Sequence, residues 1–175
     1  MDFQDIKRFT DMGQWECNFS FAYLIIEIDR MIKEEGLQLE PDFQRGRVWT
    51  DEQSSKFIEF VLQGGKTAKV IYFNKPSWHT SRDIVDGYDD FVCVDGLQRI
   101  TAIRKFMNNE IKAFGYYRNE FTGNIRGYAD MRLNINDLKT KKAVLQWYLE
   151  MNTGGVIHTK EEINRVKLLL ERECQ

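Results

Sequence analysis

The sequence predicts an α/β domain of the mixed α+β type, with a small sheet flanked by helices. Several segments repeat apolar residues at the three- and four-residue steps of a helix, and short apolar runs of strand length lie between them. The chain has 175 residues, 42% of them hydrophobic, which suits one core. We therefore expect a single domain over residues 1–175, with an N-terminal extension over 1–18 and a loop or hairpin insertion over 114–130.

Two helices are predicted in the first third of the chain. Ser20 can cap a helix over Ser20–Glu35. Gly36 is its predicted stop signal, because glycine tolerates the left-handed conformation that ends many helices. Thr50 and Gln53 have the spacing of a capping box, which predicts the start of a second helix over Thr50–Gln63.

Short runs of apolar and β-branched residues predict the strands. They are Leu37–Leu39, Lys69–Phe73, Phe91–Val94, Ile111–Phe114 and Leu133–Ile135. The last of these is interpreted as an edge strand. Residues 74–90 are polar and rich in turn formers, which indicates a hairpin or surface loop.

Three further helices are predicted, over Leu97–Asn108, Ala143–Met151 and Thr159–Arg172. Thr159 and Glu162 form a second capping box at the start of the last one. The segment Asn152–Gly155 precedes it and indicates a turn with positive φ angles.

Composition excludes several classes of protein. The formal net charge of −2 gives no overall basic field for nucleic acid, although a local basic patch is compatible with it. No apolar run has the length of a membrane span, and the N-terminus lacks a signal-peptide core. Three widely spaced cysteines make neither a disulfide framework nor a zinc pattern. We expect a protein of a reducing compartment, the cytoplasm of a bacterium or of a phage-infected host.

A polar turn connects the predicted strand Phe91–Val94 to the following helix. Helix N-termini bind anions, Gly96 allows close approach of a ligand, and Arg99 offers a planar fork of donors to phosphate. Thr101 adds a hydroxyl, and Gln98 could orient a water molecule or contact a base. Asp95 either holds Arg99 or binds Mg²⁺. The alternative is an ordinary capped helix, with Asp95 as the cap and Arg99 on the surface.

A second cluster of donors, Gln44-Arg45-Gly46-Arg47, lies in the loop after Pro41. Two arginines are costly to bury without anionic partners, so this loop is a candidate to share a cleft with Arg99. An exposed loop with ordinary salt bridges is the alternative. The aromatic and arginine residues of 114–128 could stack bases, but we favour packing against the core.

These motifs together resemble the GmrSD N-terminal domain family, which is similar to the ParB/sulfiredoxin-like superfamily. The family signature is a strand ending in Asp-Gly-Gln-Gln-Arg, followed by a Leu-Thr-like pair that Ile100-Thr101 matches. An Asn-x-Gly-Gly turn is matched by Asn152–Gly155. The resemblance spans roughly Phe19–Leu170.

The resemblance implies nucleotide binding, with phosphates at the start of the helix, and an Mg²⁺-dependent nucleoside triphosphate hydrolase. The residues that match the family motif are Gln44, Arg45, Asp95, Gly96, Gln98 and Arg99. With the resemblance, the turn at Asn152 could close over the nucleotide, where Asn152 or His158 would contact it. Asp95 would hold the metal or orient Arg99. Leu97 stands where the family has Gln, and if that Gln places the attacking water, hydrolysis is weak or lost here.

Two other functions stay open from the sequence. The same phosphate cleft could serve a non-catalytic module that binds DNA or a protein, and a DNA nuclease is the third interpretation. Full enzymes of this type carry a nuclease domain with a His-Asn-His-like site. His79 and His158 make no such site, so we expect no DNA cleavage by that route. The expected partners are a nucleoside triphosphate, DNA, and a separate nuclease or host protein.

Overall fold

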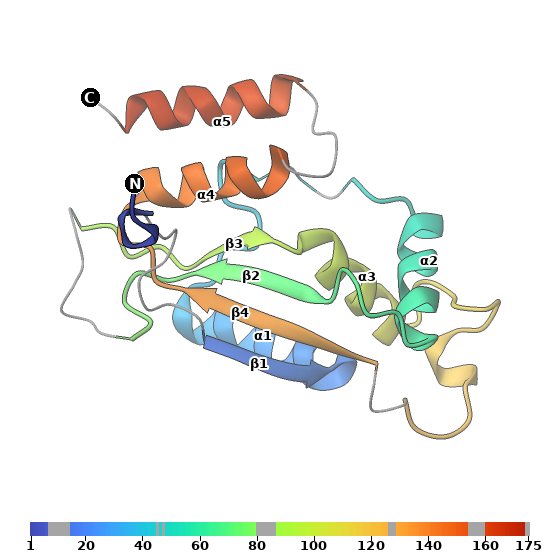
Figure 1. Cartoon of the computed structure of the whole chain (residues 1–175). Helices are drawn as coiled ribbons and strands as arrows, with labels where there is room; N and C mark the ends of the chain where they lie inside the picture. The colour runs from blue at the N-terminus through green and yellow to red at the C-terminus, as the bar shows by residue number, and fades with distance from the viewer. Residues whose placement is uncertain are drawn as a thin grey trace.

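The computed structural model describes residues 1–6, 15–44, 46, 48–79, 87–125, 129–153 and 160–173, and only the backbone of residues 4, 152, 153 and 160–163. The described residues form a mixed α+β domain (Figure 1). The helices are α1 (Phe21–Glu35), α2 (Asp51–Leu62), α3 (Leu97–Met107), α4 (Lys141–Thr153) and α5 (Lys160–Arg172). The strands are β1 (Trp15–Ser20), β2 (Val70–Asn74), β3 (Val92–Asp95) and β4 (Asp130–Asn136), and two 3-10 turns are η1 (Phe3–Asp5) and η2 (Arg118–Glu120).

The four strands form one mixed sheet in the order β1-β4-β2-β3. β4 pairs antiparallel with β1 and parallel with β2, and β2 pairs antiparallel with β3. The parallel pair requires a long crossover, and the chain between β2 and β4 supplies it with β3, α3 and the segment beyond α3. The β3–α3 connection therefore lies at the opposite end of the sheet from the carboxyl ends of β2 and β4.

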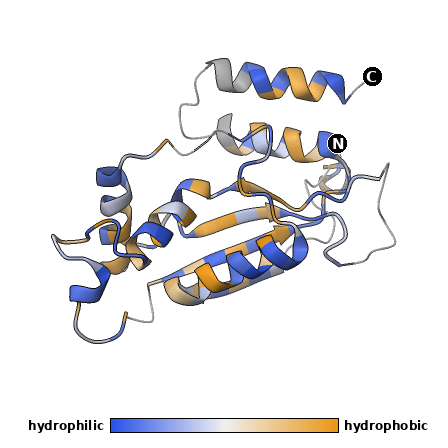
Figure 2. Ribbon diagram, turned by 180° about the vertical axis from the view of Figure 1, so that it is seen from behind, coloured by the Kyte–Doolittle hydropathy of each residue, from blue (hydrophilic) through white to orange (hydrophobic). Residues whose placement is uncertain are grey.

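Two apolar layers cover opposite faces of the sheet. One face presents Ile71, Phe73, Leu133 and Ile135 to a core shared with α1, α2 and α3. Helix α1 lies behind the sheet in Figure 1 and in front of it in Figure 2. On the other face, Val92 and Val94 of β3 pack with α4, and α5 lies outside α4. Both layers use the alternation of side chains along a strand.

The predicted helices are confirmed, each within two residues at either end. Gly36 follows α1 with φ +73°. Thr50 and Gln53 form the predicted capping box. The Gln53 N–H donates to Thr50 Oγ1 at 3.2 Å, and the Thr50 N–H donates to Gln53 Oε1 at 2.9 Å. Ser20 occupies the N-cap position of α1, but its side chain makes no capping hydrogen bond. The box predicted at Thr159 lies outside the described residues.

The strand predictions need several corrections. Leu133–Ile135 belongs to β4, which is an interior strand rather than an edge strand, because β1 pairs along its other side. β1 was not predicted, and most of it falls in the predicted N-terminal extension over residues 1–18. Its period-two pattern was present, since Trp15, Cys17 and Phe19 are half-buried and the residues between them are exposed.

Three further segments differ from the predictions. Two predicted strands contribute only isolated bridges, and part of a predicted turn is helical. Leu37–Leu39 and Ile111–Phe114 are not strands, and each contributes one isolated bridge, Gln38 to Val92 and Ala113 to Tyr116. A strand needs a neighbour along its length, and these short segments lack one in the described chain. Asn152 lies in the last turn of α4 instead of in a turn between helices. No helix among the described residues combines the length and apolar character of a membrane span.

Candidate functional site

A sharp turn connects β3 to α3 at Gly96. β3 ends at Asp95 and α3 begins at Leu97, so the predicted strand-to-helix junction is confirmed. Gly96 has φ +123°, a conformation that L side chains rarely adopt. A Cβ atom built on it would lie 2.8 Å from Cγ2 of Ile71. Backbone conformation and close packing against β2 therefore both require glycine at this position.

Asp95 and Arg99 form an ion pair across the turn, between Oδ2 and Nη2. The N-cap of α3 is Gly96, which makes no side-chain capping bond, so the capped-helix alternative with Asp95 as the cap is wrong. Only 14% of the Arg99 side chain is exposed, against 40% of the Asp95 side chain, so Arg99 is also not a surface residue. The Nε atom of Arg99 is buried and has no hydrogen-bond partner in the described chain.

The loop that precedes α2 lies against this turn, and two glutamine side chains connect them. Gln98 Oε1 accepts hydrogen bonds from the backbone N–H groups of Val48 at 3.0 Å and Trp49 at 3.2 Å. Its Nε2 donates to the Gly46 carbonyl at 2.9 Å. Gln98 thus uses both ends of its amide to position the loop, a role that differs from the predicted contact with water or a base.

Gln44 makes the second connection. Its Nε2 donates to the carbonyl oxygens of Cys93 at 3.3 Å and Val94 at 3.4 Å, at the end of β3. The structure therefore brings Gln44 to the same strand end as Asp95. Arg45 lies outside the described residues, so its expected approach to Arg99 stays a prediction.

Thr101, Asn152 and Leu97 complete the residues considered for the site. Thr101 lies in the second turn of α3 and is half-buried. The side chain of Asn152 lies outside the described residues. Leu97, which replaces the Gln of the family motif, is only 3% exposed. Its apolar side chain is packed inside the protein and offers no hydrogen bond to a ligand.

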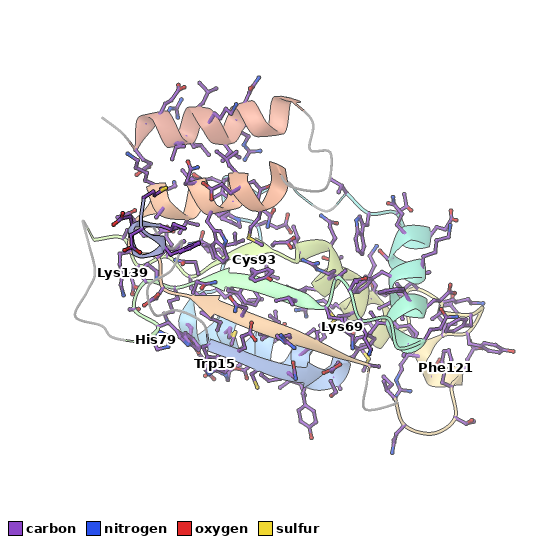
Figure 3. The ribbon with its side chains drawn as sticks, viewed as in Figure 1. Trp15, Lys69, His79, Cys93, Phe121 and Lys139 are labelled. Atoms are coloured by element: carbon purple, nitrogen blue, oxygen red, sulfur yellow. The ribbon has the colours of Figure 1, made fainter. Side chains whose placement is uncertain are left out.

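Cys93 precedes the turn on β3 and is fully buried (Figure 3). Burial, and next the negative charge of Asp95, raise the pKa of its thiol far above the ordinary range. The thiol stays protonated at neutral pH, and a protonated buried thiol is a poor nucleophile. Cys93 is therefore a core residue.

The carboxylate of Asp95 is the predicted metal ligand. In the described chain, no group of three or more His, Cys, Asp or Glu side chains could hold a metal ion. A single half-exposed carboxylate does not make a preformed cation site. One carboxylate is nevertheless compatible with an Mg²⁺ ion bound to a nucleotide, because Mg²⁺ is commonly bound by one or two carboxylates together with phosphate oxygens and water.

Comparison with known proteins identifies the family. The family described as "GmrSD restriction endonuclease, N-terminal domain" matches residues 28–169, which include the β3–α3 turn, the loop before α2 and most of the fold. No curated protein matches the chain, and neither does any solved structure. Since the match covers most of its length, the chain belongs to the family of GmrSD restriction endonuclease N-terminal domains.

Proposed function

We propose that this domain binds a nucleoside triphosphate at the β3–α3 turn and hydrolyses it with the help of Mg²⁺. In this proposal, the nucleotide controls a nuclease partner that cuts DNA, within the conflict between phage and host. The observation that carries the proposal is Arg99. Its guanidinium is mostly buried at the start of a helix, with one edge on Asp95 and its Nε lacking an acceptor.

The surroundings of Arg99 suit phosphate. The first turn of α3 has backbone N–H groups without a partner inside the helix, and it carries the positive end of the helix dipole. A buried guanidinium with an unsatisfied N–H gains a charge-assisted hydrogen bond when a phosphate oxygen arrives. The helix start and the guanidinium therefore favour the same class of ligand.

Each side chain of the turn receives a role in this proposal. Arg99 binds phosphate oxygens, and Asp95 orients Arg99 and contributes a carboxylate to Mg²⁺, which would neutralise phosphate charge. Gln98 and Gln44 fix the loop that carries Arg45, so that Arg45 reaches the same phosphates. Thr101 and Asn152 supply further hydrogen bonds to the nucleotide. Positioning and charge neutralisation are the main requirements of phosphoryl transfer.

Leu97 favours a second function, a non-catalytic module that binds nucleotide, DNA or protein through the same turn. Where the family has an amide, this chain has a buried apolar side chain that cannot place a water molecule. Binding through Gly96 and Arg99 does not need that amide. The two functions share the site and differ in turnover.

The test begins with binding of the four ribonucleoside triphosphates, with and without Mg²⁺, followed by measurement of phosphate release. Arg99→Met keeps an apolar stem but removes the fork, so nucleotide affinity should fall about ten- to a hundredfold. The matched control is Arg104→Met, since Arg104 lies on the same helix and pairs with Asp29 at 2.6 Å. It should leave affinity unchanged.

Asp95→Asn separates the enzyme from the binding module. It removes the carboxylate while keeping size, so turnover should fall far more than nucleotide affinity measured without Mg²⁺. Nucleotide binding without phosphate release in the wild type would support the module. Equal affinity in wild type and folded Arg99→Met would contradict both functions at this site.

A further inference from the structure

A pocket lies at the other end of α3 from the β3–α3 turn. It is a cavity of about 480 Å³ between the end of α2, the end of α3 and the segment that follows α3. Figure 3 labels Phe121 in this region, well away from Cys93 at the strand end. Pockets for small ligands occupy roughly 300–1,000 Å³, so this cavity has the size of a binding site.

The lining of the pocket combines apolar and polar residues. Its apolar members include Leu62 of α2, Phe106 of α3, Phe121 and Ile125. Phe106 and Phe121 contact each other edge to face, with ring centroids 6.0 Å apart. Phe114 is also part of the lining, and it is 44% exposed. The cavity therefore presents apolar surface to whatever enters it.

Arg118 is the charged residue of this lining. Its Nε is buried without a hydrogen-bond partner, and the described chain gives it no ion pair. The carboxylates that lie close along the chain or in space bind backbone groups instead. Glu120 accepts from the Tyr117 N–H at 2.6 Å, and Glu59 accepts from the Phe114 N–H at 2.6 Å.

A buried donor without a partner needs an acceptor, and the positive charge of Arg118 favours an anionic one. We propose that this pocket binds an apolar carboxylate, with the hydrocarbon part against Phe106, Phe121 and Ile125 and the carboxylate on Arg118. Such a group occurs in a free aromatic or aliphatic acid, and it occurs in the C-terminal residue of a peptide. The pocket is separate from the β3–α3 turn, so the proposal does not depend on nucleotide binding.

The test uses 4-phenylbutyrate as the probe and its neutral amide as the matched compound. Titration of the full chain is followed by amide chemical shifts, and the shifts should concentrate at Thr122–Ile125 and Arg118. The carboxylate should bind at least tenfold more tightly than the amide, because the charge-assisted bond to Arg118 is lost in the amide. Arg118→Gln should weaken the carboxylate about tenfold and remove its advantage over the amide.

Arg132→Gln is the control variant, since Arg132 is half-exposed on β4 and pairs with Glu16 at 3.3 Å. It should bind both compounds as the wild type does. A tetrapeptide that ends in phenylalanine, compared with its C-terminal amide, distinguishes the two sources of the ligand. Tighter binding of the free peptide than of phenylbutyrate indicates a peptide terminus, and the reverse order indicates a free acid.

Three outcomes would overturn the proposal. They are equal affinity for acid and amide in the wild type, shifts that concentrate at Gly96–Arg99 instead of the pocket, and no saturable binding at millimolar concentration. The wild-type comparison of acid with amide remains decisive even if Arg118→Gln does not fold.

Discussion

Two regions of this domain bury polar side chains in different ways. At the carboxyl ends of β2 and β4, asparagines satisfy one another and the backbone. Asn74 bonds both the N–H and the carbonyl of Leu138, at 2.8 and 3.0 Å, and Asn136 donates to Asn134 at 2.6 Å. At the β3–α3 turn, Arg99 has Asp95 on one edge and no partner for Nε.

The difference separates buried polar groups that are satisfied within the chain from a buried donor that has no acceptor among the described residues. A buried group whose hydrogen bonds are all made within the chain contributes to a unique packing arrangement. A buried donor without an acceptor costs stability, and a protein retains it where a partner from outside supplies the acceptor. By this criterion the asparagine cluster is part of the fold, and Arg99 is the group for which we propose a ligand.

The largest effect is expected at Gly96, where fold and site coincide. Gly96→Ala must adopt a strained φ of +123° and moves a methyl group to 2.8 Å from Ile71, so it should cost about 3 kcal/mol of unfolding free energy. Gly36→Ala is the control, because Gly36 also has positive φ but nothing lies within 4 Å of its Cβ. It should cost only about 1 kcal/mol. Urea unfolding measures both, and equal losses would show that the Ile71 contact relaxes freely.

Asn74→Ala removes the hydrogen bonds that the asparagine cluster makes to the backbone of Leu138. It leaves the Leu138 N–H and carbonyl without their partner at a fully buried position, so we expect a loss of about 2 kcal/mol in unfolding free energy. Nucleotide affinity of the folded variant should not change. Asn18→Ala, at an exposed position on β1, should stay within about 0.5 kcal/mol of the wild type. A folded Asn74→Ala with weaker nucleotide binding would remove the distinction between the two regions.

Gln98→Ala sharpens the comparison, because Gln98 lies at the site but has partners at both ends of its amide. Removing its bonds to Gly46, Val48 and Trp49 should cost about 1 kcal/mol in stability. Hydrogen exchange at the Val48 and Trp49 amides should become about tenfold faster. Gln146→Ala, an exposed change on α4, is the control and should leave this exchange unchanged. Unaltered exchange in Gln98→Ala would mean that the loop holds its position without it.

The sequence by itself determined the helices and the strand-to-helix junction. The Thr50–Gln53 box, the Gly36 stop and the apolar periodicity of α3 act over one or two helical turns, so local residues specify them. The sequence also identified Asp95, Gly96 and Arg99 as one turn, since they are neighbours along the chain.

Only the tertiary structure decided how distant segments meet. β4 looked like an edge strand because its partner β1 lies more than a hundred residues earlier, and strand pairing depends on neighbours that periodicity does not identify. The burial of Arg99 and the bonds from Gln98 to a loop about fifty residues away likewise depend on packing between α2 and α3. Local hydrogen bonds are set by spacing along the chain, whereas contacts across the core are set by which surfaces exclude water together.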